Sequence, residues 1–331
     1  MQPNYIDGRP HATLRLEAQD FGVVLRHGDT VDQFNARDVW VFTDTQRFYM
    51  HYDAASEVGW LAALAISPDG LTWTKQGAVL ELGAAGTPDS ASTSYGTTFF
   101  DGTTWHMFYL GTPNVGMPGK VPAFPYQTLK ARAETADGTW HKQPSVIPVA
   151  AVPNTFYADT ASPGMVVAHQ GEYLIFFAAA VHQADGIKRT LGLARTKDLN
   201  SAWVVDTEPV FPITEQVENS SLYFEASSNT WFLFTNHIGI DPISKAEYTD
   251  AIWVYWSQDL TKWNPENKAV VLDSSNCTWS KNIIGLPSVL KIGNRLAIYY
   301  DGYTGSDLWH MERDIGLAWL ELPLVAPQVQ S

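Results

Sequence analysis

Residues 60–73, WLAALAISPDGLTW, decide the fold, because they join an apolar strand to a tight turn that ends in tryptophan. The same pattern returns along the chain and closes at Trp140, Trp203 and Trp263, with a shorter copy that ends at Trp319. A second apolar strand precedes each copy, and these strands are residues 47–52, 105–109, 172–177, 231–235 and 295–300. Short strands that repeat at a spacing of roughly 60 residues are typical of blades packed around an axis.

This repeat predicts an all-β, five-bladed β-propeller that forms a single domain over residues 1–331. The expected blades are residues 31–82, 89–149, 158–213, 215–273 and 278–320. A β-sandwich with accidental similarity among its aromatic strands is the alternative fold. The stretch before Val31 is expected to supply a closing strand or to cover one mouth of the channel. Segments 112–127 and 238–248 read as insertions, which often form a binding rim in repeat proteins.

The amino-acid composition limits the class of protein to which the chain can belong. Hydrophobic residues make up 45% of the chain and charged residues 17%, which is typical of a folded globular protein with a large core. The 35 acidic and 21 basic residues give a net charge of −14, which argues against nucleic acid and against an anionic membrane as partners. Cys277 is the single cysteine, so the sequence excludes an internal disulfide and a cysteine-based zinc cluster. We expect neither a bound metal nor a cofactor.

We expect no targeting or membrane segment in this sequence. Residues 1–14 carry polar and charged groups throughout, and no apolar run approaches the roughly 18 residues of a membrane helix. As written, the chain is expected to be cytoplasmic, and a secreted or periplasmic location would follow if a signal peptide had been removed.

Carboxylates stand at the entrances of four of the five expected blades, where the innermost strand of each would begin. In a propeller these strands line the central channel, so their entrances converge from distant parts of the sequence. The acidic residues at the entrances are Asp38, Asp89, Asp159, Glu215 and Glu218. Glu218 is favoured over Glu215 because it leads straight into the apolar strand 221–224, and Asp89 is a reserve carboxylate.

The repeats, with Asp38, Asp159 and Glu218 at the entrances of blades one, three and four, resemble the five-bladed glycoside hydrolases of families 43, 32, 62, 117 and 130. Family 43 is the nearest pattern, and the Leu-Ala-x-Ser-x-Asp-Gly-x-x-Trp motif of residues 64–73 is common among such enzymes. The resemblance implies that Asp38 is the general base and Glu218 the general acid. It implies that Asp159 tunes a pKa and orients the acid.

Two positions depart from family 43. Val39 follows Asp38 where that family often has proline, and Asn219 follows Glu218 where it often has Gly-Pro. The resemblance is therefore to a distant or unclassified branch of these enzymes.

An inverting glycosidase needs one carboxylate that activates water and one protonated carboxyl that gives its proton to the leaving oxygen. We expect the apolar neighbours Val217 and Leu222, together with ionised Asp159, to keep Glu218 protonated near neutral pH. Arg37 is expected to keep Asp38 ionised.

Polar and aromatic side chains near the blade entrances are expected to bind a sugar. These substrate-binding candidates are Arg37, Asp89, Tyr95, Tyr157, Trp279, Lys281 and Asn282. The expected substrate is an oligosaccharide or polysaccharide from which an exo-acting, inverting enzyme removes a terminal pentose, such as α-L-arabinofuranose or β-D-xylose.

Three other functions stay open. A glycoside phosphorylase would need a cationic phosphate pocket, for which Arg37, Lys281, Arg313 and His310 are the candidates. A retaining hydrolase would hold its carboxyl groups about 5 Å apart instead of roughly 6.5–9.5 Å. A non-catalytic sugar-binding propeller would bind without turnover.

Overall fold

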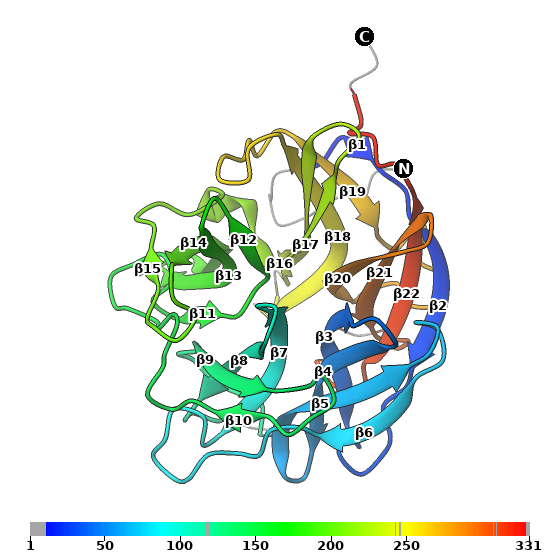
Figure 1. Cartoon of the computed structure of the whole chain (residues 1–331). Helices are drawn as coiled ribbons and strands as arrows, with labels where there is room; N and C mark the ends of the chain where they lie inside the picture. The colour runs from blue at the N-terminus through cyan, green and yellow to red at the C-terminus, as the bar shows by residue number, and fades with distance from the viewer. Residues whose placement is uncertain are drawn as a thin grey trace.

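The computed structural model describes residues 11–328, apart from 117–119, 242, 245, 307 and 309. The chain forms an all-β, five-bladed propeller, as the sequence predicts, with its small antiparallel sheets arranged around a central axis (Figure 1). The first blade contains β3 (Asn35–Thr43), β4 (Phe48–Ser56), β5 (Gly59–Ser67) and β6 (Thr74–Ala78). The second contains β7 (Ser92–Phe100), β8 (Trp105–Thr112), β9 (Gln127–Ala133) and β10 (His141–Lys142).

The remaining blades follow the same order, from an inner strand outward. The third contains β11 (Thr160–Ser162), β12 (Val166–His169), β13 (Glu172–Gln183), β14 (Gly186–Thr196) and β15 (Val204–Val205). The fourth contains β16 (Val217–Glu225), β17 (Thr230–Ile240), β18 (Glu247–Ser257) and β19 (Lys268–Leu272), preceded by a short 3-10 helix at Ile213–Glu215. The fifth contains β20 (Ile284–Ile292), β21 (Arg295–Gly302) and β22 (Asp314–Glu321).

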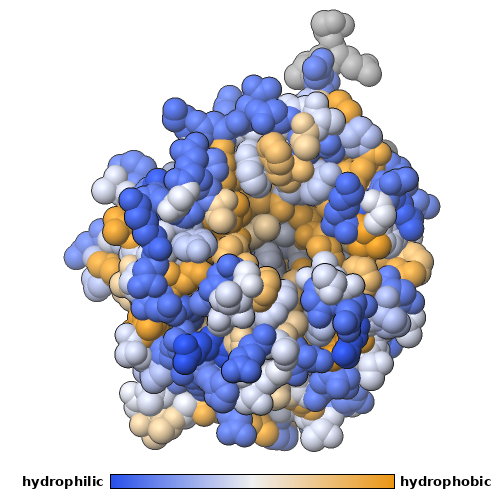
Figure 2. Space-filling model, in the orientation of Figure 1, coloured by the Kyte–Doolittle hydropathy of each residue, from blue (hydrophilic) through white to orange (hydrophobic). Residues whose placement is uncertain are grey.

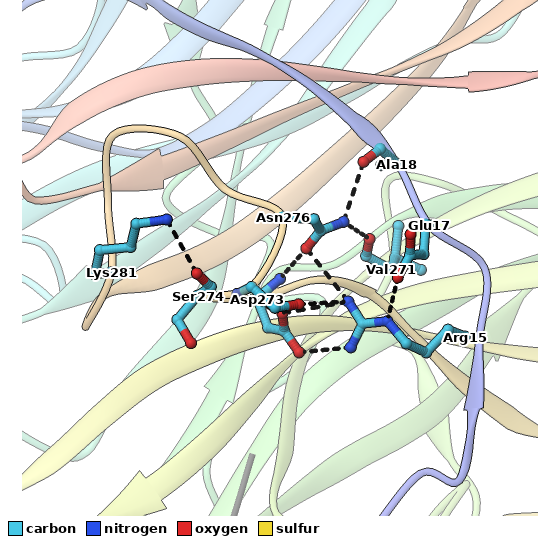
Figure 3. Close-up of polar contacts among 9 residues, drawn as sticks. Arg15, Glu17, Ala18, Val271, Asp273, Ser274, Asn276 and Lys281 are labelled. Atoms are coloured by element: carbon cyan, nitrogen blue, oxygen red, sulfur yellow. Dashed lines mark hydrogen bonds and ion pairs between the residues drawn. The ribbon is translucent and has the colours of Figure 1, made fainter. Parts of the chain in front are cut away.

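The N-terminal stretch closes the ring. Strand β2 (Gln19–Leu25) pairs antiparallel with β22, so both ends of the chain build the fifth blade, and the blue and red strands lie side by side in Figure 1. Strand β1 (Leu14–Arg15) pairs with β19 of the fourth blade. Arg15 reinforces this junction, because its guanidinium donates to Asp273 at 2.8 Å (Figure 3). Of the two possibilities for this stretch, the structure shows a closing strand.

The repeated tryptophans pack between neighbouring blades. Each ring contacts an aromatic ring on the preceding blade, at centroid distances of 5.5–6.3 Å. The pairs are Trp73 with Tyr299, Trp140 with His51, Trp203 with Phe108, and Trp263 with Phe176. A blade cannot cover both of its faces alone, and this repeated contact explains why the tryptophan pattern marks the blades in the sequence.

Three blades carry a second repeated feature, which we call the carboxylate clasp. In each clasp a carboxylate just before the inner strand accepts hydrogen bonds from a tyrosine hydroxyl and from a lysine on the outermost strand. The clasps are Asp32–Tyr52–Lys75, Asp89–Tyr109–Lys142 and Glu215–Tyr255–Lys268. They tie the inner edge of a blade to its outer edge. Among the described residues, no helix is long and apolar enough to span a bilayer.

Candidate active site

A cavity of about 280 Å³ is lined by residues from all five blades. This volume lies near the lower end of the roughly 300–1,000 Å³ that is common for small-molecule sites. Segments 112–127 and 238–248, which were expected to form a binding rim, both contribute lining residues, including Phe124 and Glu247. The face drawn in Figure 2 is hollowed where the blades meet, and apolar side chains gather around the hollow.

Much of the lining occupies equivalent positions in successive blades. On the inner strands these positions are Arg37, Ser94, Ser162 and Glu218, which pair across the sheet with Asp53, Leu110, Ala178 and Asn236. In the fifth blade the corresponding pair is Gly285 with Asp301. A second set lies near the start of the third strands and comprises Trp60, Tyr126, Arg189 and Arg313. The repeat therefore brings residues distant in sequence to one level of the channel.

Asp38 is held in an unusual backbone conformation beside this cavity. The register of β3 against β4 shifts between Arg37 and Trp40, and Asp38 has φ +50°. Its N–H donates to Oδ2 of Asp301 at 2.9 Å, and its Oδ1 accepts from Nε of Arg37 at 3.0 Å. A β-bulge re-aims a side chain, and such bulges are common beside active sites. Here it directs the Asp38 carboxylate toward a cluster of charged groups.

The carboxyl groups around Asp38 differ in how firmly they are ionised. Burial and the negative charge of Asp301 raise the pKa of Asp38, while Arg37 opposes this rise. Burial and the neighbouring Asp38 raise the pKa of Asp53 well above its ordinary value. Although burial acts against ionisation of Asp301, Arg313 and Arg37 hold its pKa below the ordinary value. The cluster thus contains carboxyls whose pKa values are shifted in opposite directions.

Glu218 lies on β16 and forms an ion pair with Arg189 of β14. Arg189 also donates two hydrogen bonds to the carboxylate of Glu247, from Nε at 2.6 Å and from Nη2 at 2.8 Å. Burial is the main cause that raises the pKa of Glu218, and the charges of Glu247 and Asp38 add to the rise, whereas Arg189 lowers it. The pKa of Glu218 therefore moves in the direction expected of a general acid, but Asp159 is not among its main causes.

The remaining polar groups of the cavity are donors or neutral side chains. Nε of Arg313 is buried and has no hydrogen-bond partner among the residues that the structure describes, although Nη1 donates to Asp301 at 2.8 Å. Burial and the nearby arginines lower the pKa of His310 to about 3, which makes this imidazole neutral. The hydroxyl of Tyr95 donates to the carbonyl of Pro163 at 2.8 Å. No group of three metal-ligating side chains occurs within the part of the chain that the structure describes.

The structure places four of the predicted site residues at this cavity: Asp38, Glu218, Arg37 and Tyr95. Asp159 is not among the lining residues. Its carboxylate accepts the backbone N–H of His182 at 2.6 Å and lies 2.9 Å from Nδ1 of the same histidine. Its backbone carbonyl accepts the N–H of the lining residue Tyr126 at 3.1 Å. The tuning role of Asp159 stays a prediction to which this position gives no support.

The other predicted binding residues make contacts elsewhere. Asp89 belongs to a clasp, and the ring of Tyr157 packs on Phe156 and Phe177. In the fifth blade, the indole of Trp279 donates to the Tyr300 hydroxyl at 2.7 Å, and Asn282 donates to the carbonyl of Ser306 at 2.8 Å. Lys281 donates to the carbonyls of Ser274 and Cys277, and the first of these bonds is drawn in Figure 3. None of the five lines the cavity.

Sequence reasoning missed three charged residues that line the cavity, namely Asp53, Arg189 and Glu247. A signal for Asp53 exists in the sequence, because Tyr-Asp follows an apolar run both at residues 52–53 and at 300–301. Arg189 follows Lys188 between the buried residues Ile187 and Leu191, and the sequence does not show which of the two charges reaches the cavity. Glu247 lies in the expected rim, but composition alone does not distinguish it from a solvated side chain.

Comparison with solved structures places this fold among known enzymes. The structure of a complex of BT0996 with RGII has a TM-score of 0.71 at 16% identity, with 96% of both proteins covered. The GH62 α-L-arabinofuranosidase domain of Coprinopsis cinerea has a TM-score of 0.61 at 12% identity, with 93% of this chain and 98% of that chain covered. A GH130 structure comes from a family of mannoside phosphorylases that contains β-1,2-mannoside hydrolases. It has a TM-score of 0.62 at 11% identity, with 99% of this chain and 98% of that chain covered.

These similarities define the class of fold, a five-bladed propeller shared with glycoside hydrolases. No protein-family model matches the sequence, and the search of curated proteins found no relative.

Proposed function

We propose that the chain is a glycoside hydrolase whose reaction takes place in the five-blade cavity. One observation carries the proposal: Asp38 and Glu218, on inner strands of different blades, line the same cavity, and each is bonded to its own arginine. Glycosidases use two carboxyl groups that flank the scissile bond. The solved structures with this fold include glycoside hydrolases, which supports the assignment.

The pKa values of both carboxyls are raised and each carboxyl is paired with an arginine, so the tasks are assigned from the resemblance to family 43. Burial and negative neighbours favour a protonated Glu218, which would give its proton to the leaving oxygen. Arg37 opposes protonation of Asp38, which would accept a proton from the attacking water. As pH falls, protonation of Asp38 stops the reaction, and as pH rises, Glu218 loses its proton. A bell-shaped pH profile of kcat/KM is therefore expected.

The proposed reaction is exo-acting and inverting, and it releases a terminal pentose, such as α-L-arabinofuranose or β-D-xylose. The small cavity supports a site for one sugar ring. The charge balance of the site supports a neutral sugar, because each arginine is already paired with a carboxylate. The α-L-arabinofuranosidase of similar fold makes arabinofuranosides the first substrates to test.

A phosphorylase is the second candidate, since the similar GH130 structure comes from a family that contains mannoside phosphorylases. Arg313 and His310 line the cavity, as a phosphate pocket would require, but Lys281 does not. Arg37 and Arg313 are bonded to Asp38 and Asp301, so little positive charge is left for inorganic phosphate. This pairing favours water over phosphate as the acceptor.

Proton NMR of the anomeric signal during turnover tests these alternatives. The protein is incubated with arabinofuranosides, xylosides, galactosides and fructosides, with and without phosphate. We expect a sugar of inverted configuration that forms without phosphate, and no product from Asp38→Asn or Glu218→Gln. A sugar phosphate would establish the phosphorylase, retained configuration would establish the retaining mechanism, and binding without product that survives Asp38→Asn would indicate a sugar-binding propeller.

A further inference from the structure

A second aspartate faces Asp38 from the neighbouring strand. Asp53 lies in the middle of β4 and pairs across the sheet with Arg37, the residue before Asp38. It is 2% exposed and lines the cavity. The carboxyl groups of Asp38 and Asp53 are close enough to share a hydrogen bond.

Two carboxylates cannot hydrogen-bond to each other unless one of them carries a proton, because ionised oxygens only accept. The backbone N–H of Tyr95 donates to Oδ1 of Asp53, which leaves the other oxygen of Asp53 to hold that proton. Asp38 instead accepts a bond from the guanidinium of Arg37, a contact that favours the ionised form. The proton shared by the pair therefore resides on Asp53.

We propose that Asp53 is a positioning residue, which stays protonated and donates a hydrogen bond to the carboxylate of Asp38. This inference rests on the proposed function, and it concerns the base, whereas the tuning role that the resemblance implies for Asp159 concerns the acid. Together with the bond from Arg37, this contact fixes the orientation of the Asp38 carboxylate, whose remaining lone pairs can accept a proton from water. It also stabilises the ionised form of Asp38, so the base works at lower pH than it otherwise would.

Other ionisable groups face this pair from several blades. They are Arg37 of β3, Tyr95 of β7, Glu218 of β16, Asp301 of β21, and Arg313 with His310 before β22. Asp301 provides an internal contrast, because it occupies the equivalent position to Asp53 in the fifth blade. It accepts from Arg313 and from the N–H of Asp38, contacts that favour its ionised form, whereas the neighbouring Asp38 favours the protonated form of Asp53.

Carbon-13 NMR of protein labelled at the aspartate carboxyl carbons tests the proton directly and needs no substrate. A protonated aspartic acid resonates upfield of an aspartate. At pH 7 we expect a protonated resonance in the wild-type protein that is lost in Asp53→Asn and kept in the clasp variant Asp89→Asn. Absence of this resonance from the wild type, or its survival in Asp53→Asn, overturns the proposal.

Kinetics separate a positioning role from a structural one. Asparagine at 53 keeps an N–H donor for Asp38, so Asp53→Asn is expected to retain activity within about tenfold, since general acid–base assistance as a whole contributes about 10²–10⁴-fold. Asp53→Ala removes the donor, so its activity falls further and the acid limb of kcat/KM moves to higher pH. The matched change Asp301→Asn, which removes an ionised group, is expected to cost more than Asp53→Asn. Equal losses in the two asparagine variants, or an acid limb in Asp53→Ala that stays at the wild-type pH, overturns the proposal.

The two experiments also separate this inference from the proposed function. A wild-type protein that is inactive on every glycoside, yet shows the Asp53 resonance, contradicts the hydrolase and leaves the aspartate pair intact. An active enzyme without that resonance contradicts the pair alone.

Discussion

Buried carboxylates have opposite roles in the cavity and in the clasps. In the clasps each carboxylate meets a lysine and a tyrosine, and the lysine and hydroxyl bonds help to lower the pKa of Asp89. In the cavity Asp38, Asp53 and Glu218 lie close to other acids, and their pKa values are raised. The Asp89 clasp thus favours an ionised carboxylate that joins the two edges of a blade, whereas the cavity holds acids whose raised pKa values cost stability and suit proton transfer.

The largest effect is expected from changes at Asp38 and Glu218. Asp38→Asn and Glu218→Gln are expected to lower kcat/KM by about 10²–10⁴-fold, because each removes a group that transfers a proton. Asparagine is tolerated at the positive φ of Asp38, as Asn219 at φ +60° shows at the equivalent position in the fourth blade. Calorimetry is expected to give melting temperatures no lower than that of the wild type for Glu218→Gln. Activity that survives both changes would place the chemistry elsewhere.

The next effect concerns stability and comes from the most buried clasp. Glu215 and Lys268 form an ion pair in which both side chains are about 5% exposed or less. Lys268→Met leaves Glu215 buried with only the hydroxyl of Tyr255, and removal of one partner of a buried pair costs about 3–5 kcal/mol. Urea unfolding measures this loss. The fraction of the Lys268→Met variant that stays folded is expected to keep the wild-type kcat/KM. A fall in kcat/KM would show that the clasp acts on the active site.

The clasp of Asp89 is expected to give a smaller and pH-dependent effect. Hydrogen bonds from Lys142, Thr87 and Tyr109 lower the pKa of Asp89 against the effect of burial. A carboxyl with a lowered pKa contributes stability above the unfolded value, about 3.9, and loses it as pH falls through the folded value. Asp89→Asn is therefore expected to cost about 1–3 kcal/mol at neutral pH. The gap from wild type should narrow in acid, and a constant gap between pH 7 and pH 3 would contradict the ionised clasp.

The fold was predictable from the sequence because a single physical need repeats along it. Each blade must cover a face with a tryptophan on its neighbour, and this produced the spacing that identified the propeller. The cavity was predictable in part, since Asp38 and Glu218 stand at inner-strand entrances. In the sequence Asp89 resembles Asp38 and Glu218, because it too stands at the entrance of an inner strand. Only the three-dimensional structure reveals that it pairs with Lys142.

The rest of the site depends on geometry that a sequence does not express. In a strand, neighbouring side chains point to opposite faces, so a shift of one residue decides which of them reaches the channel. The bulge at residues 37–40 makes such a shift, and it brings Arg37 and Asp38 to the same cavity. Arg189 and Asp53 lie inside largely buried strands, and their purpose becomes visible only when their partners from other blades are in place.

The smallest effect is expected outside the cavity, at Lys281. Its ammonium donates to backbone carbonyls of the loop that follows β19, and it does not line the cavity. Lys281→Ala is therefore expected to leave kcat/KM within about twofold, the scale of an exposed substitution of roughly 0.5 kcal/mol. Arg37→Lys is the matched change inside the cavity, where loss of the planar fork beside Asp38 should lower kcat/KM by more than tenfold, or about 1.4 kcal/mol. Equal losses in the two variants would mean that substrate extends to the fifth-blade entrance, because a lysine bonded only to its own loop has no other route to the reaction.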